Sequence, residues 1–545
     1  MPHEHSASGC VIVADSYLTD RDILASELGV ENGLPDCSLI FSAYLKWGSD
    51  CARHLSGDFA FAIWDPREQR LFACTDPFGR RPFFYAYEAG KHFIFANTMA
   101  PFRILCPDLT INDDSMIQFA LDSKPAEGTC YREVYKIAAG HHIRVTSHSL
   151  QKQKYWSLKD QKRSLPYKRR EDYYEAFREL FASAVKTRMN TDHKVMAHIS
   201  GGLDSSAVAS MAAQLASEKD QTLHGFTAIP RTLEGPSFRN GWLYHEMPVV
   251  QSVLAQYPNI EHFVFHTDPV ADPYQELRPF LAFTDQPYRN ISNYHWILAS
   301  LQRLTTLGGR ILLTGGRGNA SISWAGQSWR DKASALYRGA KIWKNPEQLF
   351  EGYYAHHNQK FLRTVAAKRI LRRRGIILDK HYFMLSQRFS SSINGSSRPL
   401  SLWYGVEQLD PTMDLKLVEF CYNLPQWVYF RGRETLEKRL LVREALAGIV
   451  PEPVRHNPNR GEQAADWYLQ YNNHRLKWRE GLKQIAPGAA SRLWQWYDRK
   501  AMFDLFDVYE SIERPGRDVN LHVGLGLMRC LSLGFYLDYL ERNTP

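Results

Sequence analysis

A polar, glycine-containing turn at residues 200–206 is the part of this chain best suited to chemistry. It reads Ser-Gly-Gly-Leu-Asp-Ser-Ser and follows a short apolar run, Lys194 to Ile199, that is typical of a buried strand. Adjacent glycines let a backbone approach a ligand closely, and the N–H groups at a helix start attract phosphate. An ordinary turn with one Ser or Asp as helix cap is the alternative, but it accounts for only one of the four polar side chains. We therefore predict a phosphate-binding loop.

The kind of phosphate chemistry follows from what the loop contains. Neither the Walker pattern nor a dinucleotide fingerprint is present, because no Lys follows the glycines and no G-x-G-x-x-G occurs here. S-G-G-x-D-S resembles the pyrophosphate loop of the N-type ATP pyrophosphatases, which split ATP between its α and β phosphates. By this resemblance ATP and Mg²⁺ are the cofactors and Asp204 helps to hold the metal. The resemblance assigns pyrophosphate to Ser200, Gly201, Gly202, Leu203, Ser205 and Ser206.

Segments around this loop divide the chain into two parts. Short alternating runs in the front part, such as Gly57 to Asp65, Arg70 to Asp76 and Lys91 to Thr98, predict antiparallel strands. A polar, lysine-rich stretch follows, which we interpret as a linker. The predicted organisation is an N-terminal domain at 1–150, a linker at 151–172 and a second domain at 173–545.

The back part alternates apolar strands with helical segments. The expected strands include Thr222 to Ile229, Ile260 to His266 and Arg310 to Gly316. This alternation predicts an α/β domain with a mainly parallel sheet, whose ligand lies at the carboxyl ends of the strands.

Composition and charge limit the possible functions. The net charge of +9 includes a basic run at Lys368 to Gly375, which is either a solvated face or attracts an anionic substrate, and no nucleic-acid module accompanies it. Eight cysteines without a C-x-x-C pair fit a reduced cytosol and argue against zinc. The apolar region Leu521 to Leu540 is interrupted by Arg529 and Asp538, so it predicts a packed amphipathic helix and no membrane span. We expect a cytoplasmic protein.

Several separated motifs, in the right order, resemble the asparagine synthetase superfamily over nearly the whole chain. The front segments are VADSYLTDRDILASELG, DPFGRRPFFYA and GTCYREVYKIAAGHHIRV; the back segments are SGGLDSS, ILLTGGRGN, GVEQLDPTMDLKLVEFCYNLP and EKRLLVREAL. The resemblance implies an α+β glutaminase-like domain of the N-terminal-nucleophile type. An α/β synthetase domain of the ATP pyrophosphatase (adenine nucleotide alpha hydrolase-like) type would follow it. It also implies nucleotide contacts at Thr314 and Gly315.

The first departure from the superfamily concerns its glutaminase nucleophile. Glutaminases of this class use Cys as the first mature residue, beside its own free amine. Here the second residue is Pro2, and the first cysteine, Cys10, falls inside an expected strand. We therefore predict that residues 1 to about 150 form a domain without glutamine hydrolysis and that Cys10 is a buried structural thiol.

Two further departures fall in the predicted ATP site. Asn319 stands where the superfamily has a metal-binding Asp, and a neutral amide is a poorer magnesium ligand than a carboxylate. Asp204 and Asn319 are the predicted metal ligands, with Asp204 the stronger one. The superfamily lysine that stabilises the transition state aligns near Asn459, and Arg460 is the nearest cation. Arg460 is thus a candidate catalytic cation, with a salt bridge at a helix start as the alternative.

These departures, with RGEQAADW and GGRGNASISWAG, resemble the lasso peptide macrolactam synthetases. That resemblance implies adenylation of an Asp or Glu side chain of a ribosomal precursor peptide. The peptide's own N-terminal amine then attacks, an isopeptide bond closes the ring, and AMP and pyrophosphate leave. A leader-binding protein and a leader protease would be the partners.

Glu407 is the second candidate catalytic residue. It aligns with the glutamate of a catalytic dyad in the related β-lactam synthetases, while the tyrosine partner of that dyad falls at Gly316. Glu407 would then recognise the peptide or its amine; a structural, helix-capping carboxylate is the alternative. Two other functions stay open. One is an asparagine synthetase, using ammonia or glutamine, and the other is a non-catalytic scaffold protein.

Overall fold

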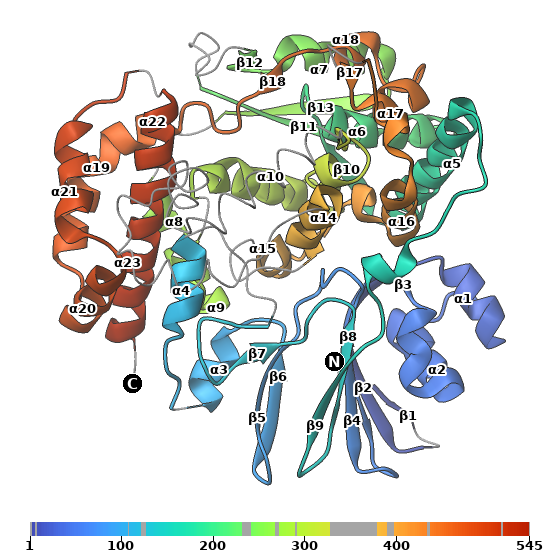
Figure 1. Cartoon of the computed structure of the whole chain (residues 1–545), viewed down its shortest axis with the longest axis horizontal. Coiled ribbons are helices and arrows are strands. Elements are labelled where there is room, and N and C mark those ends of the chain that lie inside the picture. The colour runs from blue at the N-terminus through green and yellow to red at the C-terminus, as the bar shows by residue number, and fades with distance from the viewer. Residues whose placement is uncertain are drawn as a thin grey trace, which may run out of the picture.

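The computed structural model describes most of the chain. The described residues are 3–5, 8–106, 108–120, 127–231, 241–266, 272–288, 291–327, 379–389, 397–432, 437–513 and 516–543. The basic run Lys368 to Gly375 lies outside these residues, so its predicted role stays a prediction. Figure 1 shows the N-terminal strands at the bottom, the parallel sheet with its helices above them, and the C-terminal helices on the left.

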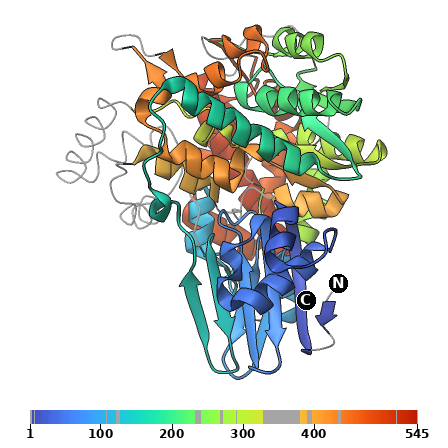
Figure 2. The same ribbon diagram turned by 90° about the vertical axis from the view of Figure 1, so that its right-hand side faces the viewer.

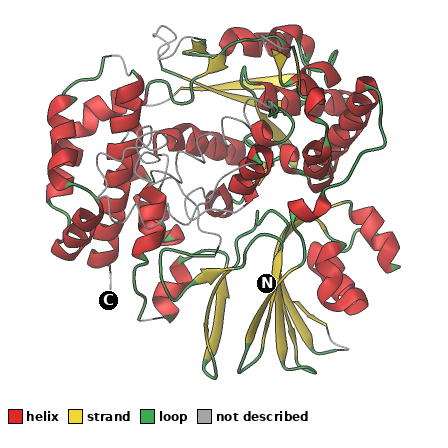
Figure 3. Cartoon of the chain, in the orientation of Figure 1, coloured by secondary structure: helices red, strands yellow, loops and turns green. Residues whose placement is uncertain are grey.

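The N-terminal part is built on two antiparallel sheets (Figures 1 and 3). The larger sheet has the order β1-β2-β3-β4-β8-β9 and the smaller one the order β6-β5-β7. The strands are β1 (His3–His5), β2 (Cys10–Thr19), β3 (Ser56–Asp65), β4 (Arg70–Thr75), β5 (Phe84–Glu88), β6 (His92–Ala96), β7 (Tyr135–Lys136), β8 (His141–Val145) and β9 (Leu150–Lys154). The three strands expected from alternation are confirmed as β3, β4 and β6. β9 pairs with β8, so this sheet continues into the stretch expected to be a linker.

Helices cover and flank these sheets. Apolar residues of α2 pack on β2, β3 and β4 in one core that contains Leu39, Phe41 and Phe61. The helices of this part are α1 (Arg21–Leu28), α2 (Asp36–Trp47), η1 (Gly48–Arg53), α3 (Ala100–Leu105), α4 (Asp113–Ala120) and η2 (Leu158–Gln161). Cys10 begins β2 and is fully buried, which confirms its expected place in the core.

The second part contains the predicted parallel sheet, with the order β13-β11-β10-β14-β15 and every pair parallel. Its strands are β10 (Lys194–His198), β11 (Leu223–Ile229), β13 (Ile260–His266), β14 (Gly309–Leu313) and β15 (Glu407–Leu409). Alternate residues serve opposite faces. Met196 and Leu312 pack with α10, whereas Ala197 and Leu313 pack with α5 and α6. Helices therefore cover both faces, as the apolar runs predict.

The remaining elements of this part connect and flank the strands. They are α5 (Arg170–Met189), α6 (Leu203–Ser217), β12 (Trp242–Leu243), α7 (Met247–Gln256), α8 (Pro273–Glu276), α9 (Arg278–Thr284), η3 (Ile291–Asn293), α10 (Tyr294–Thr306), η4 (Gly318–Ala320), α14 (Lys380–Phe389), α15 (Ser397–Tyr404), η7 (Pro411–Met413), α16 (Leu415–Asn423), η8 (Gln426–Val428), β16 (Phe430–Arg431), β17 (Glu437–Lys438), α17 (Leu440–Ala445), α18 (Glu452–Arg455) and β18 (Arg460–Gly461). Figure 2 shows this part above the antiparallel strands.

A helical group closes the chain. It comprises α19 (Trp467–Lys483), α20 (Pro487–Trp496), α21 (Arg499–Val508), α22 (Arg517–Val519), the π-helical segment η9 (Asn520–Leu527) and α23 (Met528–Arg542). Among the described residues, Asn520–Arg542 is the one helical stretch long and apolar enough to cross a membrane, and 72% of its apolar window is buried within the protein. It packs against α19 and α20, as the interrupted apolar pattern predicts.

One hydrophobic core joins the N-terminal part to this helical group. Phe102 of α3 and Met116 of α4 belong to the same cluster as Trp478 of α19 and Leu533 of α23. A hydrogen bond also crosses this boundary: the Arg529 guanidinium of α23 donates to the Ala120 carbonyl of α4 at 3.3 Å. The blue-to-cyan helices α3 and α4 lie near the red α23 in Figure 1. The two parts are thus packed together through a shared interior.

Candidate active site

The predicted phosphate loop lies between β10 and α6, at the carboxyl edge of the parallel sheet. α6 begins at Leu203, so Ser200, Gly201 and Gly202 form the turn. The Gly202 N–H donates to Ser200 Oγ at 3.1 Å, and the hydroxyls of Ser200 and Ser205 lie 2.6 Å apart. The Ser206 hydroxyl, fully buried, donates to the Ser200 carbonyl. Side chains hold the turn in shape, which leaves the helix start to face a ligand.

A second loop, after β14, packs directly on the first. The Thr314 N–H donates to the Leu409 carbonyl at 2.9 Å, which anchors the loop to β15. A Cβ on Gly315 would lie 2.5 Å from the Asp204 carbonyl carbon, and one on Gly318 would lie 2.4 Å from the Asp204 carboxyl carbon. Only glycine fits at these two positions. The sequence-predicted residues Thr314, Gly315 and Asp204 are therefore brought together.

Asn319 lies on this second loop and contacts an arginine that sequence reasoning did not select. Its side-chain oxygen accepts a hydrogen bond from Arg439 Nη2 at 3.0 Å. Burial lowers the pKa of Arg439, the nearby Arg460 lowers it further, and the Asp204 carboxylate opposes both. Arg439, Arg460 and Asp204 are thus close enough to interact electrostatically. The EKRLLVREAL motif was visible in the sequence, but nothing in its spacing distinguished Arg439 from its neighbours.

The backbone at Arg439 is unusual for a side chain of this size. Its φ of 63° places it in the left-handed region, directly before α17. Non-glycine residues rarely adopt this conformation, and such residues gather at functional sites. The turn directs the side chain back toward Asn319.

Arg460 lies on β18, which pairs with β12 in parallel through Arg460 and Trp242. Its N–H donates to the Gly241 carbonyl at 3.0 Å, and its side chain is exposed. Among the ion pairs between described residues, none includes Arg460. Both explanations of Arg460, a catalytic cation or a helix-start ion pair, therefore stay predictions.

Glu246 is a second residue that sequence reasoning missed. It precedes α7 and accepts hydrogen bonds from the Gly201 and Gly461 N–H groups. A Cβ on Gly461 would lie 2.0 Å from the Glu246 carboxyl carbon, so the contact is close. Burial raises the pKa of Glu246, although both hydrogen bonds oppose the rise. This carboxyl joins the phosphate loop to the strand that carries Arg460. No local motif in LYHEMP marks it.

Glu407 begins β15 and does not cap a helix. Arg81 Nη2 donates to its Oε2 at 2.7 Å, and Arg398 Nη1 donates to its Oε1 at 2.8 Å. Within β15 it pairs with Ile311 of β14, two residues before the strand reaches its carboxyl end. Its side chain is 28% exposed. The structure thus places Glu407 beside the sheet that carries the phosphate loop, at the boundary with the N-terminal part.

The residues present suit one magnesium ion bound together with a nucleotide. Mg²⁺ is usually held by one or two carboxylates plus the phosphates of the substrate. Asp204 supplies one carboxylate beside the phosphate loop, and Asn319 directs its oxygen at Arg439. No group of three or more His, Cys, Asp or Glu side chains in metal-binding arrangement occurs within the described ranges. Asp204 is therefore the candidate ligand, with the rest of the shell coming from phosphate and water.

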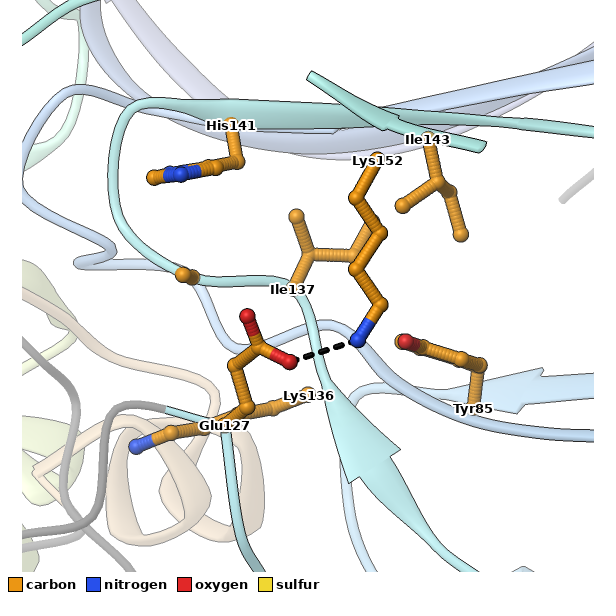
Figure 4. A pocket seen from close by; sticks show the side chains of 8 residues that line it. Tyr85, Glu127, Lys136, Ile137, His141, Ile143 and Lys152 are labelled. Carbon is orange, nitrogen blue, oxygen red and sulfur yellow. Dashed lines mark hydrogen bonds and ion pairs between the residues drawn. The ribbon is translucent and has the colours of Figure 1, made fainter. Parts of the chain in front are cut away.

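A small cavity lies between the two sheets of the N-terminal part (Figure 4). Lys152 forms an ion pair with Glu127 at 2.5 Å inside it, and Tyr85 points toward the same amine. Burial lowers the pKa of Lys136 to about 8, with Glu127 opposing. None of the described residues that line this cavity is a cysteine.

Burial affects the ionisation of six of the cysteine thiols. Burial raises the pKa values of the thiols of Cys51, Cys74, Cys106, Cys130, Cys421 and Cys530. The reactive form of cysteine is the thiolate. Burial therefore disfavours the thiolate form of these six cysteines.

A glycine-containing loop on a parallel sheet, after an antiparallel N-terminal part, is the arrangement that the family comparisons address. Residues 176–521 match the family described as asparagine synthase, and residues 24–156 match the glutamine amidotransferase domain. The first match covers more than half of the 545 residues, so the chain belongs to the asparagine synthase family. This is a family of ATP-dependent ligases that form amides.

Individual relatives agree with this assignment. Asparagine synthetase [glutamine-hydrolyzing] 3 of Bacillus subtilis is 26% identical over 517 residues, which are 87% of this chain and 78% of the relative. Amidase chyE of Penicillium rubens is 29% identical over 218 residues, 39% of this chain and 32% of the relative. A putative asparagine synthetase [glutamine-hydrolyzing] 2 of Methanocaldococcus jannaschii is 27% identical over 48% of each chain.

A solved glutamine phosphoribosylpyrophosphate amidotransferase from B. subtilis aligns with 44% of this chain and 51% of its own. The identity is 13% and the TM-score is 0.21. A TM-score this low does not establish a common fold.

Proposed function

We propose that this protein is an AMP-forming ligase that activates a carboxylate with ATP and joins it to an amine. The observation that carries the proposal is the packing of the 200–206 loop against Gly315 and Gly318, with Arg439 bonded to Asn319 of the same second loop. Family membership supports the amide-forming, ATP-dependent part. The release of AMP and pyrophosphate is the part that we add.

The proposed reaction has two steps. A carboxylate oxygen of the substrate attacks the α-phosphorus of ATP, the bond to the bridging oxygen breaks, and pyrophosphate leaves. The amine nitrogen then attacks the acyl carbon of the adenylate, an amide bond forms, and AMP leaves with the bonding pair while the amine loses a proton.

Each residue of the site has a place in this scheme. The helix start at Leu203 and the hydroxyls of Ser200 and Ser205 bind the departing pyrophosphate. Arg439 and Arg460 stabilise the negative charge that grows on it in the transition state. A magnesium ion held at Asp204, when bound, neutralises part of the phosphate charge.

Two substrate classes are candidates. The names of the relatives favour aspartate and ammonia, with asparagine as the product, and this candidate has the broader support. The residues that differ from the superfamily pattern favour the second candidate, in which a precursor peptide closes its own macrolactam ring. One such residue is Asn319, which is bound to Arg439 at the position where the superfamily has a metal-binding carboxylate. Such an intramolecular attack needs no separate ammonia source. A leader-binding protein and a leader protease would be partners in that second case.

One set of assays decides among these candidates. Purified protein receives Mg²⁺-ATP with aspartate plus ammonium, with aspartate plus glutamine, or with a short precursor peptide encoded beside it. AMP and pyrophosphate are quantified, and products are weighed by mass spectrometry. Asparagine identifies the first candidate, and a peptide lighter by one water identifies the second. ADP as the main nucleotide product would refute the adenylation scheme. No nucleotide turnover with any substrate would favour a scaffold protein.

A further inference from the structure

Four side chains of alternating charge form a closed ring across the boundary between the two parts. Asp15 of β2 and Arg81 of the turn after β4 come from the N-terminal part, and Arg398 of α15 and Glu407 of β15 come from the ligase part. Each arginine contacts both acids. Arg81 Nη1 lies 3.3 Å from Asp15, and Arg398 Nε lies 3.0 Å from Asp15.

The ring fixes the orientation of the Glu407 carboxylate. Arg81 occupies Oε2 and Arg398 occupies Oε1, so the carboxyl plane is held from both sides. Each carboxylate oxygen has room for two hydrogen bonds, and one on each is used here. With its side chain 28% exposed, Glu407 can still accept a bond from an incoming amine.

The acids and arginines of the ring stabilise each other's charged forms. Burial would raise the pKa of Asp15, but Arg81 and Arg398 outweigh it and hold that pKa below its usual value. Burial would lower the pKa of Arg81, and Asp15 and Glu407 together raise it instead. Arg81 is 3% exposed, so Asp15 and Glu407 supply the opposite charges that a buried guanidinium needs.

The side chain of Asp76 holds the turn that carries Arg81. The Asp76 carboxylate accepts the N–H groups of Phe78, Arg80 and Arg81 at 2.9, 3.0 and 3.1 Å. Because these hydrogen bonds fix the backbone of Arg81, its side chain has a defined position relative to the N-terminal part. Arg81 touches the ligase sheet.

We propose that Arg81 is a positioning residue, through which the N-terminal part orients Glu407 for the attack of the amine. This inference rests on the proposed ligase function. In this scheme the N-terminal part contributes to the second step, amide formation. That contribution does not depend on glutamine hydrolysis.

The test separates the two steps of the reaction. Arg81→Met, Arg81→Lys, Glu407→Gln and Arg81→Met/Glu407→Gln are compared with wild type. Arg67→Met is the matched control, because Arg67 lies in the same part of the chain and pairs with Asp65 at the end of β3. Exchange of labelled pyrophosphate into ATP measures adenylation. Single-turnover formation of the amide measures the second step, with whichever substrate supports wild-type turnover.

We expect Arg81→Met to slow amide formation by roughly 100-fold, since a misplaced group has an effect of this order. Pyrophosphate exchange and the KM for ATP should change little, Arg81→Lys should recover part of the rate, and the double variant should be no slower than Glu407→Gln. A purely structural role would lower both steps together. Equal losses in both steps, or fully additive effects of the two substitutions, would overturn the proposal. A wild-type protein without exchange or amide formation would refute the ligase function itself.

Discussion

The contact between Asn319 and Arg439 changes how the metal site should be understood. A carboxylate at position 319 would be shared between the arginine and a metal ion. The amide present here directs its one oxygen to Arg439 Nη2, at 3.0 Å. We therefore expect position 319 to orient Arg439 at the predicted phosphate loop, and the predicted metal role to fall on Asp204.

The first prediction compares these two side chains. Asp204→Asn should abolish nearly all ligation, because it removes a carboxylate that belongs to the first loop and packs on the second. Asn319→Ala should reduce activity much less. Both are measured as initial rates of pyrophosphate release across a magnesium titration, with circular dichroism to verify folding. Equal losses would show that the two residues share the metal.

The second prediction concerns Arg439. Arg439→Met should lower kcat by about 100- to 1,000-fold, the range seen when one group that stabilises transition-state charge is removed. Arg431→Met is the control, because that arginine is 54% exposed and pairs with Glu437 and Glu444 away from the phosphate loop. The two variants are compared by steady-state kinetics in ATP. An Arg439→Met enzyme as active as the control would remove Arg439 from the site.

The third prediction is a dependence of stability on pH. Burial raises the pKa of Glu246 above its ordinary value of 4.5. The folded protein therefore binds this proton more tightly than the unfolded chain, so the stabilisation is present at low pH and is lost as pH rises through the folded value. Glu246→Gln keeps an oxygen that can accept the two N–H groups and has no proton to lose.

The free energy of unfolding, from urea denaturation between pH 4.5 and 8, tests this. The difference between Glu246→Gln and wild type should shift in favour of the variant as pH rises. A difference that does not vary with pH would show that Glu246 has an ordinary pKa.

At the scale of elements, two loops from neighbouring strands form one binding edge. The loop after β14 has two adjacent glycines in different surroundings: Gly315 packs on Asp204, and Gly316 faces open space. A Cβ on Gly315 would meet the Asp204 backbone at 2.5 Å, whereas a Cβ on Gly316 would have nothing within 4 Å. Alanine substitutions at Gly315 and Gly316 therefore form a matched test and control.

Gly315→Ala should separate the two loops and abolish pyrophosphate release, and it should also lower the melting temperature. Gly316→Ala should leave both close to wild type. Thermal unfolding followed by fluorescence and a pyrophosphate assay measure the two effects. Similar behaviour of the two variants would mean that the loops tolerate displacement.

Hydrophobic periodicity and turn residues were sufficient to predict these strands, because both signals are local in the sequence. The runs at 222–229 and 260–266 became β11 and β13, and the expected parallel sheet is present. Loop residues 200–206, 314 and 315 could be predicted because each motif is contiguous, and the structure packs the two loops together. Glu246 and Arg439 were not, because their roles arise from contacts over more than 40 and 100 residues of chain, with Gly201 and Asn319. One of the two arginines that bind Glu407, Arg81, is likewise 326 residues away in the chain.

At the scale of the whole molecule, the shared core predicts cooperative unfolding. Phe102 of α3 is fully buried in the cluster that contains Trp478 and Leu533. Phe102→Ala should destabilise the protein by about 3–5 kcal/mol, and calorimetry should show one transition that moves as a unit. Ile104→Ala on the same helix is the control, because Ile104 is 85% exposed. Two separate transitions, with only one moved by Phe102→Ala, would show that the parts unfold independently.

This shared interior also determines where the gene could be recombined with those of its relatives. A crossover in the stretch after β9 would join the α3 and α4 surface of one parent to the α19 and α23 surface of another. The apolar side chains of the two parents would not match there, although the junction itself would be undisturbed. Functional chimeras should therefore inherit the segments 100–120 and 467–542 from the same parent, even though nearly 350 residues separate them.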